Sequence, residues 1–278
     1  KGSSYRQWVA AVQEYGRNNT NEQDYWDNIL NDYDNDNSLI KLVNSEVPAI
    51  YTGFELNQEQ TRLLLQEGNR AYNTEINDLL LTALGYALAG ITNNNINYIV
   101  LEGHGREEID DSLDTTRTVG WFTTMYPVRL EVTKDIGGSL KNIKESLRLV
   151  LNKGIGYGVV IGYKIGLPKI SFNYLGQFNQ AEQSKDQEAW YITGEHSGVS
   201  VHTANQDYNI LNINGLVIDG CLQFSISSKL DQDTSNILRD YFKEQLTKII
   251  DHTISQTRCY LTTSDVNNII NQEYLDRI

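Results

Sequence analysis

The sequence predicts an α/β fold with a layered mixed sheet and flanking helices. Apolar residues recur at helical spacing from 76 to 88, and a short apolar run follows at 98–101. Further along, an Asp-Gly pair at 219–220 separates two β-prone runs, which is a strong signal for a hairpin. Because helical and strand patterns are interspersed through the 278 residues, we expect them to form a layered domain.

The first fifty residues predict two helices and a loop. Apolar side chains between 5 and 15 follow helical spacing, and a shorter apolar face spans 25–30. The Asn- and Asp-rich run 31–37 cannot bury itself, so it predicts a loop. Residues 50–54 then predict a short strand, and Asn57 is a suitable N-cap for the helix that follows.

The strongest helix of the first half begins near Thr74. Its apolar positions from 76 to 88 form a wide stripe, which is typical of core packing. The run 98–101 predicts a buried strand, and the alternation at 128–132 predicts a second strand. A further helix is expected from about Ser139.

The second half adds a strand, a hairpin and a long helix. Alternation over 170–174 predicts a strand that points Asn173 away from the apolar face. Residues 211–217 and 222–228 flank the Asp-Gly pair and should form the hairpin. A last long helix is expected from about Thr234, because its apolar residues share one face.

Composition and charge exclude several functions. A formal net charge of −13 disfavours nucleic acid and anionic membranes, because phosphate binding needs a basic surface. No stretch approaches the roughly 18 apolar residues of a membrane span, and no apolar segment follows the N-terminus, so we expect a cytoplasmic protein without a signal peptide. Cys221 and Cys259 predict two reduced thiols, and no Cys/His spacing resembles a zinc site, so we expect no bound metal.

One polar segment directly follows the apolar run 98–101. Residues 102–107 read Glu-Gly-His-Gly-Arg-Glu, and residues at strand ends are well placed to face a cleft. The glycines on both sides of His104 let the backbone approach another surface closely. From spacing alone, a glutamate at a strand end is more often an ordinary surface residue.

Three further segments interrupt the apolar elements. Residues 117–123 read Arg-Thr-Val-Gly-Trp-Phe-Thr, and the pair 121–122 favours a core plug over a ligand wall. Three alternating glycines at 154–158 could cradle a phosphate, but no Lys-Ser/Thr follows and 159–161 is strand-like, which favours a tight turn. Residues 172–178, Phe-Asn-Tyr-Leu-Gly-Gln-Phe, form an ordinary strand pattern.

Together and in this order, the four segments resemble the motif series of nonribosomal peptide synthetase epimerization domains, within the condensation-domain superfamily. Residues 4–8 resemble the helix that leads out of the family's first lobe, and 261–265 resemble its closing Thr-Pro-Ser-Asp segment. Condensation domains usually carry Val-Gly-x-Phe-Val-Asn where this chain has Val-Gly-Trp-Phe-Thr at 119–123, which favours epimerization. Two mild departures are Asn179, where the family often has Asp, and Thr263, where Pro is common.

The resemblance implies a chloramphenicol-acetyltransferase-like second lobe of a two-lobe domain whose active site lies between the lobes. The His-His-x-x-x-Asp-Gly motif of the family's first lobe does not occur in these residues. We therefore expect 1–50 to be connecting helices from the absent first lobe and 51–262 to be the C-terminal catalytic lobe. Residues 263–278 would be a tail, a possible lead-in to a docking helix. This chain alone would be inactive, because it supplies only part of the active site.

The reaction implied is inversion, from L to D, of the α-carbon of an aminoacyl or peptidyl thioester. It needs a base for the Cα proton, an acid on the opposite face and stabilisation of the enolate oxygen. By resemblance Glu102 is an acid/base residue, Tyr174 is a proton donor or orienting group, and Asn173 is its polar companion. A tunnel that excludes water would raise the pKa of Glu102, which suits a base near neutral pH.

The resemblance also implies supporting residues. Trp121 would line the substrate tunnel, with core packing as the alternative. His104 would orient Glu102 or play a structural part between Gly103 and Gly105. Arg106 is expected to form an ion pair with Glu107 that shapes the loop.

No cofactor would bind to the chain directly, since a phosphopantetheine arm is supplied by a partner carrier (thiolation) domain. The first lobe and a downstream condensation domain are the other partners expected. Two alternatives stay open: a condensation-type acyl transfer domain, and a non-catalytic module that docks a carrier protein. A His-His-x-x-x-Asp-Gly motif upstream of this sequence would favour catalysis.

Overall fold

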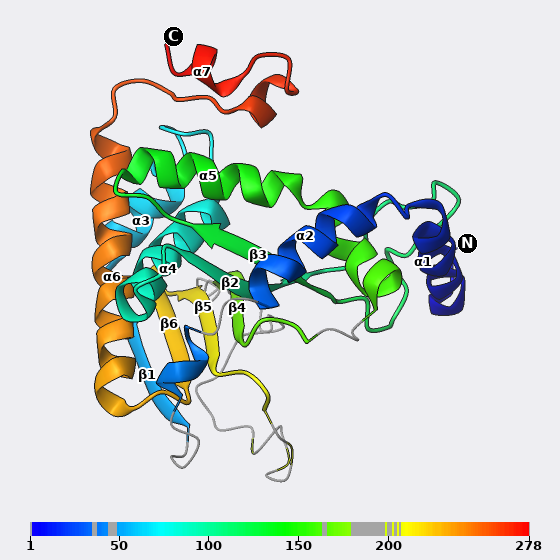
Figure 1. Cartoon of the computed structure of the whole chain (residues 1–278), viewed down its shortest axis with the longest axis horizontal. Helices are drawn as coiled ribbons and strands as arrows, with labels where there is room; N and C mark the ends of the chain where they lie inside the picture. The colour runs from blue at the N-terminus through cyan, green and yellow to red at the C-terminus, as the bar shows by residue number, and fades with distance from the viewer. Residues whose placement is uncertain are drawn as a thin grey trace, which may run out of the picture.

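The centre of the molecule is a six-stranded mixed sheet with strand order β1-β6-β5-β4-β2-β3 (Figure 1). The computed structural model describes residues 2–34, 38–43, 49–162, 166–178, 198, 202, 205 and 207–277. The strands are β1 (Ile50–Glu55), β2 (Ile96–Gly103), β3 (Thr124–Glu131), β4 (Ile170–Phe178), β5 (Leu211–Ile218) and β6 (Cys221–Ser228). Strand β4 runs parallel to both β2 and β5, and the other pairs are antiparallel, which confirms the predicted mixed α/β fold.

The helices begin close to where the sequence predicts them. They are α1 (Tyr5–Asn18), α2 (Glu22–Asp34), α3 (Gln58–Gln66), α4 (Ile76–Thr92), α5 (Ile136–Leu149), α6 (Gln232–Ser255) and the short α7 (Gln272–Leu275). Asn57 caps α3 as predicted, because its side chain accepts a hydrogen bond of 2.8 Å from the backbone N–H of Gln60. The hairpin is also confirmed, with Asp219 and Gly220 at positive φ between β5 and β6.

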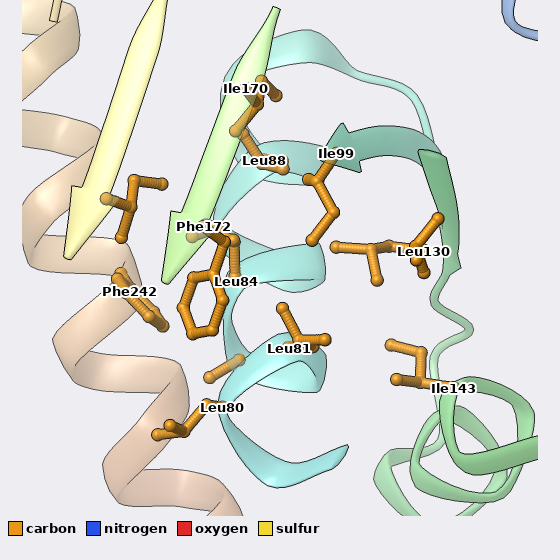
Figure 2. Close-up of a cluster of buried hydrophobic side chains, with 14 of the residues drawn as sticks. Leu80, Leu81, Leu84, Leu88, Ile99, Leu130, Ile143, Ile170, Phe172 and Phe242 are labelled. Carbon is orange, nitrogen blue, oxygen red and sulfur yellow. The ribbon is translucent and has the colours of Figure 1, made fainter. Parts of the chain in front are cut away.

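One face of the sheet is covered by α3, α4, α5 and α6 and holds the main core. The predicted apolar stripe of α4 lies here, with Leu80, Leu84 and Leu88 fully buried. Figure 2 shows these side chains close to Phe172 of β4 and Phe242 of α6. Burial of each such leucine stabilises the fold by ~1.5–3 kcal/mol. The stripe therefore fixes the sheet against the helix layer.

Along β5 and β6 the other face of the sheet is polar, whereas Tyr98 and Val100 of β2 are buried on it. Along β5 the buried residues Leu211 and Ile213 alternate with the half-buried Asn212 and Asn214. In β6 the exposed Ser225 lies on that same polar face, because it pairs with Asn214. Helices α3 to α6 lie on the opposite side, and α2 contacts this face through Tyr33 and Tyr98, so a ligand or another lobe could approach the strands beyond α2.

The prediction of a loop at 31–37 is wrong for residues 31–34. Helix α2 continues to Asp34, and residues 35–37 lie outside the described residues. The helix extends because Trp26 and Leu30 are buried in the main core, which outweighs the low helix propensity of Asn and Asp. Residues 1–50 thus contribute to the same core as the sheet. The domain boundaries expected at 50 and 262 stay predictions.

The strand predicted at 159–161 is also wrong. Residues Leu151–Gly154 form a 3-10 turn and Tyr157–Ile161 form a π-helical turn. Tyr157 is fully buried, and its ring packs edge-on against Trp26 of α2, with 5.2 Å between the ring centroids. A long-range aromatic contact therefore decides the local conformation, although the apolar run alone is typical of a strand.

Candidate active site

Glu102 lies at the carboxyl end of β2, where five buried residues give way to an exposed one. It pairs with Met125 of β3, and two residues earlier Val100 pairs with Ser171 of β4. Side chains alternate along strands, so Glu102 shares the polar face of the sheet with Asn173. The structure thus brings two of the three predicted catalytic residues to one face.

A pocket of about 380 Å³ opens on this face beside Glu102. Its walls come from β2, β3, the segment entering β4 and the segment entering β5: Val100, Glu102, Met125, Leu167, Pro168, Lys169, Ser171, Asp207, Tyr208 and Asn209. Four segments that are distant in sequence therefore meet around one carboxylate.

The side chain of Tyr174 projects from the opposite face of β4. It pairs with Gly215 of β5 and packs against the main core, half-buried. Burial raises the pKa of Tyr174, so its hydroxyl is protonated at neutral pH. The strand becomes irregular directly after this residue, between Tyr174 and Gln177. Alternation therefore separates Tyr174 from Glu102 and Asn173, as the pattern of 172–174 predicts.

Two glycines let the loop after β2 fold back on itself. Gly105 has a φ of +68°, and a Cβ there would lie 1.6 Å from the backbone oxygen of Phe122. At Gly103 a Cβ would lie 2.7 Å from Oγ1 of Thr124. The close backbone approach expected around His104 is confirmed, and the surface approached is the far end of the same loop.

Arg106 holds that loop together through three contacts. Its guanidinium donates hydrogen bonds to the backbone oxygens of Thr115 and Thr118, the latter at 2.8 Å. It also lies 3.7 Å above the centre of the Phe122 ring. Glu107 faces His104, so the expected ion pair between Arg106 and Glu107 is wrong.

His104 makes its contacts inside the loop. Its Nε2 lies 3.2 Å from a carboxylate oxygen of Glu107, and its Nδ1 accepts a hydrogen bond of 3.0 Å from the backbone N–H of Arg106. These contacts lie within the loop, which favours the structural role for this residue.

The Trp121–Phe122 pair divides its two side chains between core and solvent. Phe122 is only 6% exposed and forms a small second core with Trp8 and Ile155. Trp121 is 79% exposed, and its backbone oxygen accepts a 2.5 Å hydrogen bond from the hydroxyl of Tyr5. The core plug is thus confirmed for Phe122 and is wrong for Trp121.

The glycines of 154–158 make room for a buried carboxylate. A Cβ at Gly156 would lie 1.9 Å from Oε2 of Glu22, which is 1% exposed. Glu22 accepts hydrogen bonds from the hydroxyl of Tyr15 and, at 3.2 Å, from Nε1 of Trp26. A carboxylate beside these glycines disfavours phosphate binding, in agreement with the tight turn that the sequence predicts. Nothing in the local sequence marks Glu22 as buried, because an acidic residue at a helix start is usually exposed.

Sequence reasoning missed most of the pocket wall. Met125 could have been found from strand register, because it faces Glu102 across the β2–β3 pair. The residues 167–169 and 207–209 carry no local signal, since they reach the pocket only through the parallel pairing of β4. Within the described part of the chain, no group of three or more His, Cys, Asp and Glu side chains could hold a metal ion. Its helices also include none that is long and apolar enough to cross a membrane.

Comparisons with known proteins show the family of this chain. The family model described as Condensation domain matches residues 1–269. Gramicidin S synthase 1 of Brevibacillus brevis is 36% identical over 293 residues, which cover 95% of this chain and 26% of that protein. Surfactin synthase subunit 1 of Bacillus subtilis is 38% identical over 231 residues, which cover 77% of this chain and 6% of that protein. The chain thus spans about a quarter or less of these two relatives.

Solved structures give the same result. The epimerization domain from the third module of tyrocidine synthetase B matches with a TM-score of 0.75 and 31% identity, over 92% of this chain and 61% of that one. The first condensation domain of the calcium-dependent antibiotic synthetase matches with a TM-score of 0.63 and 15% identity, over 92% and 58%. The second likeness shows the fold alone. With its family model matched almost throughout and its fold shared by these structures, the chain belongs to the condensation domain family.

Proposed function

We propose that this chain is the second lobe of an epimerization domain that inverts the α-carbon of a carrier-bound aminoacyl or peptidyl thioester. The observation that carries the proposal is the 31% identity to an epimerization domain over 92% of the chain. The matched condensation domain is only 15% identical over the same share. The four ordered motifs and the position of Glu102 beside an open pocket support the same reading.

In this proposal Glu102 removes the Cα proton, and an acid on the opposite face returns one. Glu102 is exposed in this chain, so any desolvation of its carboxylate has to come from a surface that covers it. A first lobe with the His-His-x-x-x-Asp-Gly motif would supply that surface and the opposing group. The chain matches 61% of the epimerization domain structure, which leaves length for such a lobe.

Asn173 and Tyr174 complete the proposed set. Asn173 lies on the face of Glu102 and can donate an amide hydrogen bond to the enolate oxygen. Tyr174 keeps the proton-donor role by resemblance alone, because its side chain projects from the opposite face in the middle of β4. The substrate would arrive on the phosphopantetheine arm of a carrier domain, so no resident cofactor is needed.

The test uses the two-lobe protein that contains this chain, with an aminoacyl group loaded on its carrier domain in deuterated buffer. Glu102→Gln should slow the exchange of the Cα hydrogen by about 10²–10⁴-fold, because it removes a general base without changing shape. Glu55→Gln is the matched control, since Glu55 is an exposed carboxylate at the end of β1 on the same sheet face. Exchange at the normal rate in Glu102→Gln would show that the assignment is wrong.

A further inference from the structure

The pocket beside Glu102 has an apolar floor. Val100 and Pro168 are buried at its base, and the half-buried Leu167 adds a third apolar wall. Met125 stands at the rim, 39% exposed, directly across the β2–β3 pair from Glu102. Side chains paired in this way have Cβ atoms about 4.5–5.5 Å apart, so a group bound against Met125 also lies next to the carboxylate.

The main acidic group of the opposite rim is already engaged. The carboxylate of Asp207 accepts hydrogen bonds from the backbone N–H of Asn209 at 2.9 Å and from the side chain of Asn212 at 2.6 Å. Lys169 lies 5.9 Å from the centre of the Tyr208 ring. The carboxylate of Asp207 therefore shapes the segment entering β5, while Val100, Pro168 and Leu167 offer a ligand an apolar surface between the polar side chains of the rim.

The chemistry of the proposed reaction decides what can occupy this floor. The Cα that loses its proton to Glu102 carries three other substituents, each about 1.5 Å away: an amino or amide nitrogen, the thioester carbon and the side chain. The first two are polar and lose hydrogen bonds with water if buried against Val100 and Leu167. Only for an apolar side chain is burial against these residues favourable.

We propose that this pocket is the subsite for an apolar amino-acid side chain and that Met125 sets the size of side chain accepted. The inference rests on the proposed epimerization function and assigns its substrate class: branched aliphatic or aromatic residues. A volume of about 380 Å³ falls within the range of pockets that hold small ligands, which leaves room for an aromatic ring.

The first test compares alanyl, leucyl, phenylalanyl and lysyl groups on the carrier of the two-lobe protein. The unchanged protein should show a higher kcat/KM for leucyl and phenylalanyl than for lysyl groups. Met125→Trp should lower the ratio of kcat/KM for phenylalanyl over alanyl about 10-fold or more, because it fills the pocket. Retained turnover of the alanyl group shows that the variant is folded. Ser225→Trp is the matched control, since it adds the same bulk to the same sheet face on β6 and should leave the ratio unchanged.

Two results would overturn the inference. An equal loss for all four groups in Met125→Trp would mean that the pocket holds the shared pantetheine arm. Lysyl turnover as fast as phenylalanyl turnover would mean that the floor does not select apolar side chains.

A binding measurement distinguishes failure of the side-chain subsite from failure of the proposed epimerization. The dissociation constants of phenylalanyl- and alanyl-pantetheine amides do not depend on turnover. In the two-lobe protein, the phenylalanyl amide should bind at least 10-fold more tightly, and Met125→Trp should remove that difference. Equal binding of the two amides contradicts the subsite even if epimerization is observed. A preference for the phenylalanyl amide without Cα exchange contradicts epimerization alone.

Discussion

Lys144 and Asp265 form a buried ion pair between α5 and the segment that resembles the family's closing motif. The Lys144 side chain is 1% exposed, and its Nζ lies 2.5 Å from Asp265 and 2.9 Å from the backbone oxygen of Tyr72. Asp265 also accepts hydrogen bonds from Asn73 and from the backbone N–H of Thr262. Because Lys144 and Asp265 pair with each other, the closing segment holds the chain against α5 after the chain leaves α6.

Removing one partner of this pair should be costly. Lys144→Met should lower the free energy of unfolding by about 3–5 kcal/mol, because it leaves the Asp265 carboxylate buried without its cation. Lys141→Met is the control: Lys141 pairs with the half-exposed Asp276, so its loss should cost only ~0–1 kcal/mol. Denaturant unfolding measures both. A loss below 1 kcal/mol for Lys144→Met would refute the structural role.

Asp265 should also make stability depend on pH. Burial alone would raise the pKa of this carboxyl, but hydrogen bonds from Lys144, Thr262 and Asn73 outweigh it and hold the pKa below the ordinary value. A depressed folded-state pKa stabilises the protein above the unfolded value of about 3.9 and loses that effect as pH falls through the folded pKa. The stability difference between the unchanged chain and Asp265→Asn should therefore be large at pH 6 and shrink below about pH 4. A difference that does not vary with pH would contradict this assignment.

At the scale of elements, the loop after β2 depends on a glycine that no other residue can replace. Gly105→Ala should open the loop, because the new Cβ would overlap the Phe122 backbone oxygen at a positive φ. Faster amide hydrogen exchange across 106–122 would report the opening. Gly166→Ala, where a Cβ meets nothing within 4 Å, should leave exchange unchanged. Unchanged protection in Gly105→Ala would contradict the packing described here.

The elements that sequence predicts correctly are those whose signals are local. The Asn57 cap, the stripe of α4 and the Asp-Gly hairpin each depend on residues within one or two turns. The end of α2 and the turn at 157–161 depend instead on the packing of Trp26 of α2 against Tyr157, two residues that are distant in sequence. No local pattern reports such a contact, so periodicity mislabels both segments.

In the candidate site, too, local signals are predicted correctly and long-range contacts are not. Strand alternation correctly separates Asn173 from Tyr174, and the end of an apolar run correctly places Glu102 at the exposed end of β2, while its catalytic role stays a prediction. The exposure of Trp121 could not be predicted, because its neighbour Phe122 takes the space in the small core beside Trp8. The pocket wall was missed because it forms only when three strands and the segment entering β5 come together.

At the scale of the whole molecule, Glu102 lies exposed at the end of β2, whereas the opposite face of the sheet is covered by helices. An epimerase needs that carboxylate shielded from water and opposed by a second proton carrier. The 278-residue chain alone should therefore show no Cα exchange on a loaded carrier, whereas the two-lobe protein should show it. Exchange catalysed by this chain alone would mean that the described lobe already holds a complete site.

The most direct test of the account is the chirality of the carrier-bound group. The two-lobe protein receives a carrier loaded with an L-aminoacyl thioester, and the group is released and resolved into enantiomers. Epimerization predicts a mixture of L and D forms that reaches the same ratio from either starting enantiomer. Condensation-type chemistry predicts instead that the L configuration is kept and that an amide product forms when a second loaded carrier is added, and this result would contradict the account.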